Sequence, residues 1–137
     1  MTDTLTVPVV PGAADPLQRL QVYRFAMAAI RDATVDAGEM GRDPLMREVA
    51  GQLVRAAGSI AANVAEGYSR GTTVDRRRFY EYALGSAREC LVWYEASPTP
   101  VPASRTDRLV SIRRLLLTML RNSRRDAGAD RGKFTDG

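Results

Sequence analysis

Four stretches with helical periodicity, separated by proline and glycine, constrain the fold of this chain more than any other feature. Apolar and small side chains recur at steps of three and four residues over about 16–37, 44–66, 73–96 and 105–125. No stretch alternates as a strand would. Because the connections between the first three stretches are short, consecutive helices should run antiparallel. The sequence therefore predicts an all-α protein, an antiparallel up-down-up-down four-helix bundle.

Capping signals set the predicted helix bounds. Each helix should begin at a capping residue: Asp15 before Pro16, Asp43 before Pro44, Thr72 with Asp75, and Ser104 with Asp107. Glycine should end the first two helices: Gly38 and Gly41 end the first, and Gly67 ends the second. The proline-rich segment 97–104 is expected to be an extended connector.

One domain accounts for the chain. The bundle is expected over 15–126, with a flexible N-terminal tail at 1–14 and a disordered C-terminal tail at 127–137. The longest apolar runs are far shorter than the roughly 20 residues that span a bilayer. The first residues lack the basic start of a signal peptide. With a single cysteine, Cys90, no intrachain disulfide can form. We therefore expect a cytoplasmic protein that has no contact with membranes.

Positive charge gathers near the C-terminal end. The net charge is +4, and nineteen of the twenty basic residues are arginine. Arginine binds phosphate in a forked geometry, so this bias is typical of nucleic-acid binding, but a GC-rich coding sequence also produces it. Between Ser104 and Arg125 there are seven arginines and only one acid, Asp107. Five of the seven are candidate contacts to RNA or DNA: Arg113, Arg114, Arg121, Arg124 and Arg125.

The residues needed for several kinds of catalysis are missing. The chain contains no histidine, which removes Ser-His-Asp catalysis and every histidine-containing metal site. Cys90 lies on the apolar side of the third predicted helix, where a buried structural thiol is favoured over a nucleophile. We therefore predict a protein that is not an enzyme and that has no cofactor and no metal.

The second predicted helix carries a polar stripe among small apolar residues. Its members are spaced at four, four and three residues, which places them on one side of the helix: Arg55, Ser59, Asn63 and Glu66. One interpretation is an internal hydrogen-bond network, with Glu66 paired to an arginine such as Arg77 or Arg78. The other is a polar surface that faces a ligand. A subunit interface is compatible with both.

Two blocks of sequence carry a family resemblance. They read QLVRAAGSIAANVAEGYSR over 52–70 and RRRFYEYALGSARECLVWYEAS over 76–97. These blocks resemble the four-helix-bundle family of intervening-sequence proteins, whose members are encoded in insertions within bacterial large-subunit ribosomal RNA genes. The resemblance covers roughly 18–125. Ala61 stands where the family usually has proline, so the second helix should be straighter there.

The resemblance implies a mode of assembly and two possible roles. Known relatives form five-fold rings, none is known as an enzyme, and a distant branch serves diversity-generating retroelements as an accessory protein. We therefore expect a homo-oligomer, a homopentamer by family, whose interface draws on the third helix: Tyr80, Trp93 and Tyr94. The alternative is that these aromatic residues belong to the core of one chain.

The sequence and the resemblance leave three candidate functions. The first is a non-enzymatic oligomeric scaffold whose basic fourth helix contacts nucleic acid. The second is an accessory subunit that binds a protein partner such as a reverse transcriptase. The third, an enzyme acting through Glu66 and Arg55, is disfavoured because the sequence has neither histidine nor a recognisable catalytic motif.

Overall fold

The computed structural model describes the backbone of residues 15–135 and the side chains of residues 15–125. Within this part of the chain all regular secondary structure is helical. There are four α-helices, α1 (Gln21–Met40), α2 (Arg47–Ser69), α3 (Thr73–Ala96) and α4 (Ala103–Thr135), preceded or separated by two short 3₁₀ turns, Pro16–Arg19 and Pro44–Met46. The predicted fold class is confirmed.

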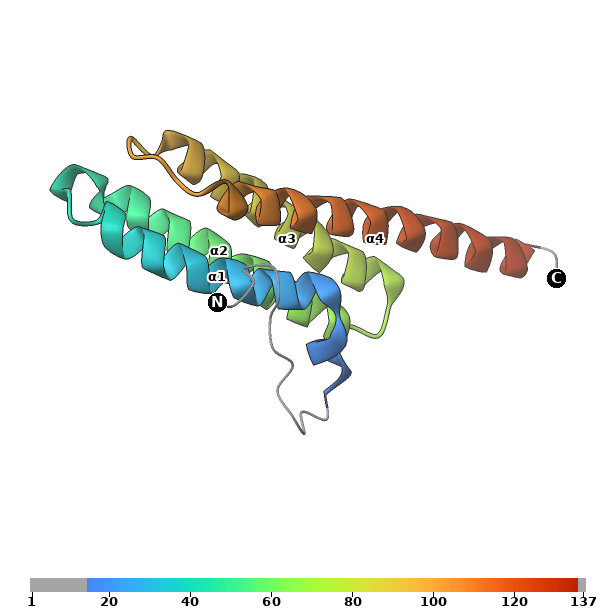
Figure 1. Ribbon diagram of the computed structural model, residues 1–137. Coiled ribbons are helices and arrows are strands. Elements are labelled where there is room, and N and C mark those ends of the chain that lie inside the picture. Colours follow the sequence, from blue (N-terminus) through green and yellow to red (C-terminus); the bar gives the residue numbers. More distant parts are fainter. Residues whose placement is uncertain (1–14, 136–137) are drawn as a thin grey trace.

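The four helices form a bundle in which the chain direction reverses at every connection (Figure 1). Each helix packs against two neighbours, so the contacts run from α1 to α2, α2 to α3, α3 to α4, and α4 back to α1. At its C-terminal end α4 continues beyond the other three helices (Figure 1). No helix in the described part of the chain is long and apolar enough to cross a membrane.

The two Asp-Pro pairs begin 3₁₀ turns rather than α-helices. Asp15 accepts a hydrogen bond from the backbone N–H of Leu17 at 3.0 Å, and Asp43 accepts one from Leu45 at the same distance. The first turn ends at Leu20, whose extended backbone separates it from α1. The second leads directly into α2. The capping residues were predicted, but not the tighter turns that follow them.

Helix α3 has the predicted bounds. The first helix covers Gln21–Met40 instead of 16–37 and runs through Gly38, and α2 and α4 also differ from prediction. The Thr72 hydroxyl accepts from the N–H of Asp75 at 3.2 Å, as a capping residue should. The second helix does not stop at Gly67 but continues to Ser69. Gly67 serves packing instead, since a Cβ there would lie 2.6 Å from Cε1 of Tyr80.

The fourth helix is longer than predicted at both ends. It begins at Ala103, ahead of the expected cap at Ser104, and the carbonyl of Pro102 accepts from the N–H of Arg105 at 3.0 Å. It also continues to Thr135, through most of the segment predicted to be a disordered tail at 127–137. This segment contains glycine but no proline, and a glycine inside a helix costs only about 1 kcal/mol relative to alanine. The predicted tail at 1–14 lies outside the described residues.

Small side chains allow the first three helices to pack closely. The buried core of α1, α2 and α3 is rich in alanine, including Ala26, Ala29, Ala33, Ala56, Ala57, Ala83 and Ala87. Larger buried residues fill the space towards the centre of the bundle: Leu53, Ile60, Val64, Leu109, Ile112 and Leu116. Burial of this apolar surface supplies most of the stability of such a bundle.

Candidate functional site

Two members of the polar stripe on α2 form a hydrogen-bond network with α3. The Asn63 amide donates to the Ser59 hydroxyl at 2.9 Å and to the Ser59 carbonyl at 2.8 Å. The Ser86 hydroxyl of α3 donates to the Ser59 hydroxyl at 2.9 Å. Ser59 and Asn63 are half-buried, so these bonds replace contacts with water that folding removes. The stripe therefore joins two helices here, and Ser86 is the partner that the sequence did not identify.

The other two members of the stripe lie at the surface. Glu66, on the last turn of α2, is paired at 2.6 Å with Arg70, the residue that follows the helix, and not with the predicted Arg77 or Arg78. Four residues separate the two on one helical face, which is the favoured spacing for an ion pair. Arg70 also lies over the ring of Phe79, 4.8 Å from its centroid. Arg55 is exposed. The four residues therefore do not converge on one ligand site.

An ionic cluster of three half-buried residues and the buried Arg108 joins α1 to α4. Arg105 of α4 contacts both Asp32 at 3.4 Å and Asp36 at 2.9 Å, and Arg108 Nε lies 3.4 Å from Asp32. The Tyr94 hydroxyl of α3 donates to Asp36 at 2.6 Å. Burial and this hydrogen bond raise the pKa of Tyr94. Arg108 is only 2% exposed, and its Nη1 has no hydrogen-bond partner among the described residues. The cluster is neutral in sum, which suits a role in holding α4 in place.

Five further arginines of α4 lie at or near the surface. Arg114, Arg121, Arg124 and Arg125 are exposed and Arg113 is half-buried. Steps of seven and then three or four residues place them on one side of the helix. None of them forms an ion pair with a residue in the described part of the chain. The sequence-predicted nucleic-acid contacts are thus brought together as a basic surface, which we call the α4 basic face.

Two of the three aromatic residues predicted at an oligomer interface lie in the core. Tyr80 is 5% exposed and Tyr94 is 6% exposed, and both pack within a single chain. The prediction was wrong for these two because the wide apolar arc of α3 is filled by α2 and α4. Trp93 is half-buried, and its indole N–H donates to Glu89 at 3.2 Å. A different aromatic residue of α3, Tyr82, is 53% exposed.

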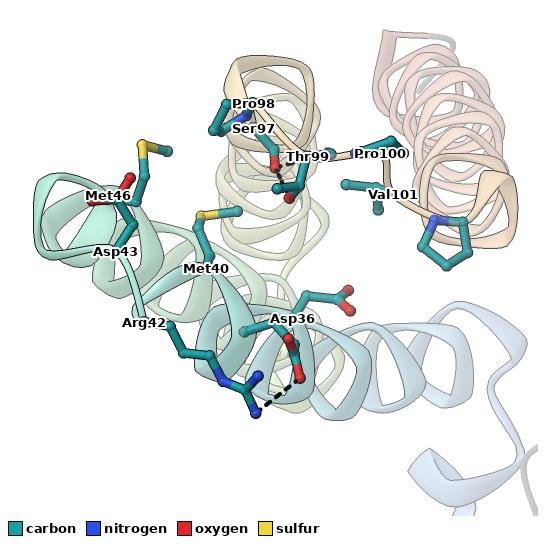
Figure 2. Close-up of a pocket in the computed structure, with 12 residues that line it drawn as sticks. Asp36, Met40, Arg42, Asp43, Met46, Ser97, Pro98, Thr99, Pro100 and Val101 are labelled. Carbon is teal, nitrogen blue, oxygen red and sulfur yellow. Dashed lines mark hydrogen bonds and ion pairs between the residues drawn. The ribbon is translucent and has the colours of Figure 1, made fainter.

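A pocket of about 430 Å³ lies beneath the proline-rich connector (Figure 2). Met40, Met46 and Val101 line it together with the connector prolines. Its charged residues already have partners: Asp36 binds Arg105 and Tyr94, Arg42 pairs with Glu39 at 3.4 Å, and Asp43 caps the turn after it. The pocket therefore offers an apolar surface without a set of converging free polar groups.

Cys90 is a buried thiol. It is fully covered by the bundle, and burial raises its pKa to about 12. A thiol in this state is a poor nucleophile at neutral pH, because only the thiolate reacts. The described residues contain no group of three or more histidine, cysteine, aspartate or glutamate side chains placed to hold a metal ion.

The fold and its surfaces define the class of protein. It is an antiparallel four-helix bundle in which polar side chains form hydrogen bonds and ion pairs between helices, and its last helix carries a basic face. A model of the 23S rRNA-intervening sequence protein family matches residues 18–99, more than half of the chain, so the chain belongs to this family. The match covers α1, α2 and α3 and stops before α4. No curated protein and no solved structure matches the chain.

Proposed function

We propose that this protein is a non-enzymatic, self-associating helical scaffold that contacts nucleic acid through the α4 basic face. The observation that carries the proposal is the division of the arginines on α4. Arg105 and Arg108 form ion pairs with Asp32 and Asp36 of α1. The five arginines of the basic face have no acidic partner in the described part of the chain. Unpaired arginines on one helical face favour binding to phosphate.

The shape of α4 supports the same proposal. Arg77 of α3 reaches the Leu120 carbonyl at 3.5 Å, and α3 begins only four residues before Arg77. Beyond Leu120 the helix leaves the bundle, carrying Arg121, Arg124 and Arg125 with it (Figure 1). A projecting basic helix can approach a phosphate backbone without steric conflict from its neighbours.

Self-association is supported by α3. Val74, Tyr82 and Val92 are each more than half exposed on its outer side. The family resemblance further suggests a ring of five. A ring needs two different faces on each chain, and its contacts would have to come from residues other than the buried Tyr80 and Tyr94.

Binding to labelled RNA and duplex DNA across a salt series tests the nucleic-acid part. Five phosphate contacts predict that log K falls with log salt at a slope of up to about −4.5. Substituting all five arginines of the basic face by glutamine should abolish binding. If the unmodified protein shows no detectable binding to nucleic acid at low salt, the nucleic-acid part is overturned. If it instead binds a protein partner with an affinity that does not depend on salt, the accessory-subunit alternative is favoured.

A matched pair of triple variants controls for net charge. The first, Arg114→Gln with Arg121→Gln and Arg125→Gln, should weaken binding and reduce the slope. The second removes three exposed arginines elsewhere and should leave the slope nearly unchanged: Arg19→Gln, Arg31→Gln and Arg55→Gln. Equal losses in the two variants would show that binding depends on total charge and not on α4.

A further inference from the structure

The outer side of α3 carries a stripe of residues that the bundle does not use. Val74 is 76% exposed, Tyr82 53% and Val92 55%. Arg78, Gly85 and Glu89 lie between them and are also exposed. All six recur at steps of three or four residues, so they form one line of roughly 27 Å along the helix. We call this line the α3 outer stripe.

The charged members of the stripe form no ion pairs with other described residues. The Arg78 guanidinium lies 5.3 Å from the centroid of the Phe79 ring and forms no ion pair with a described residue. Glu89 accepts a hydrogen bond from Trp93 and likewise forms no ion pair in the described part of the chain. Two unpaired opposite charges, eleven positions apart on one face, are therefore available to a partner.

The stripe is complementary to itself when reversed. If two α3 helices cross antiparallel with their two-fold axis between residues 83 and 84, Arg78 meets Glu89 and Tyr82 meets Gly85. Val74 then lies opposite Trp93, one residue from the exposed Val92. Gly85 provides room, because a Cβ at this position would meet nothing within 4 Å. Each contact occurs twice, as a two-fold interface requires.

We propose that the α3 outer stripe binds the same stripe of a second copy of this chain, antiparallel and about a two-fold axis. A parallel arrangement in register would place Arg78 against Arg78 and Glu89 against Glu89, which repel each other. The proposal rests on the self-association part of the proposed function and identifies its contact surface. It is independent of nucleic-acid binding.

The pair should be weak. One helical face buries less than the roughly 800 Å² per partner that a stable interface needs. Dimer formation should therefore depend on concentration and on salt, and its dissociation constant can be measured by sedimentation. A two-fold contact cannot close a five-fold ring, so in a ring of five this contact could only join one ring to another.

Charge exchange tests the register. Arg78→Glu alone, or Glu89→Arg alone, should raise the dissociation constant of the pair by about tenfold or more, because each places like charges in contact twice. The double exchange should restore the constant to within about threefold of the unmodified value. Arg31→Glu is the matched control, since it makes the same charge change at an exposed position on α1, diagonally across the bundle.

A second variant separates association from folding. Gly85→Ala should raise the melting temperature, because alanine favours a helix, yet it should weaken the pair by filling the space that Tyr82 of the second copy occupies. A variant that is more stable and still pairs normally would overturn the proposal.

The outcomes also distinguish this proposal from self-association in general. If the unmodified protein associates but neither Arg78→Glu nor Gly85→Ala alters the dissociation constant, the chain associates through another face and the α3 proposal fails alone. A protein that remains monomeric at every concentration would defeat both proposals.

Discussion

Arg105 on α4 and Asp36 on α1 form a two-point contact, with Nε 2.9 Å from Oδ2 and Nη2 3.3 Å from Oδ1. The two residues are 69 positions apart and are among the least exposed charged side chains in the bundle, at 16% and 15%. The same Asp36 oxygen accepts the Tyr94 hydroxyl. One carboxylate thus connects three helices, in addition to the apolar contacts of α4 in the core.

Removing Asp32 should destabilise the protein more than removing a surface acid. Asp32→Ala leaves the buried Arg108 without its counter-charge. We expect the free energy of unfolding to fall by about 2–3 kcal/mol. This is less than the loss for a fully buried ion pair, because Asp32 is partly solvated. Urea denaturation measures this. Glu39→Ala, which removes the exposed partner of Arg42, should change stability by under about 0.5 kcal/mol. Equal effects of the two variants would contradict the account.

Arg108→Met should be tolerated. Methionine fills a similar space without a buried charge, and Asp32 keeps Arg105 as its partner. Replacement of a buried ion pair member by a well-packed apolar side chain is often neutral, so we expect stability within about 1 kcal/mol of the unmodified protein. If this variant loses as much as Asp32→Ala does, Arg108 contributes a specific interaction that the geometry does not show.

Two glycine-to-alanine substitutions should act in opposite directions. In Gly67→Ala the new methyl group would lie 2.6 Å from the buried Tyr80 ring and 3.1 Å from the Arg76 carbonyl, so stability should fall by about 1–3 kcal/mol. In Gly85→Ala the methyl group enters open space and should add up to about 1 kcal/mol. Thermal melts of the two variants, recorded at low protein concentration to avoid association, compare them directly. A stabilised Gly67→Ala would show that the helices are not so close.

Stability should decline at alkaline pH. Burial raises the pKa of Cys90 from 9.0 to about 12 and also raises the pKa values of Tyr80 and Tyr94 above 10.0. Each group keeps its proton in the folded chain and loses it first in the unfolded chain, so the unfolded state is favoured as pH rises above about 9. Urea denaturation at a series of pH values measures this decline.

Cys90→Ala provides the control for the pH series. It should reduce the part of the decline that begins near pH 9, because the thiol is the first of these groups to ionise in the unfolded chain. The tyrosine contribution at higher pH should persist. The ordinary pKa values of cysteine and tyrosine lie between about pH 8 and pH 11. A free energy of unfolding that stays constant over this range would contradict the burial of Cys90, Tyr80 and Tyr94.

Local signals predicted more of this structure than non-local ones could. The bounds of α3 and the caps at Asp15, Asp43 and Thr72 depend on neighbouring residues, and they were predicted correctly. Gly67 follows the last apolar position of its helix and resembles a stop signal. Its contact with Tyr80 arises only when α3 folds back against α2.

The candidate site shows the same limit. Arg108 looks like a surface residue on a basic helix, because nothing near it in sequence identifies Asp32 as its partner. Likewise, periodicity placed Tyr80 and Tyr94 on an apolar face of α3 but could not say whether helices of the same chain cover it. The polar stripe on α2 was predicted, whereas its partner Ser86 was not.

Light scattering of the unmodified protein over a wide range of concentrations tests the central claim most directly. The account predicts that the mass rises with concentration from the 15.0 kDa of one chain towards at least twice that value, and that added salt reverses the rise. A mass that stays at that of a single chain up to the solubility limit would contradict it.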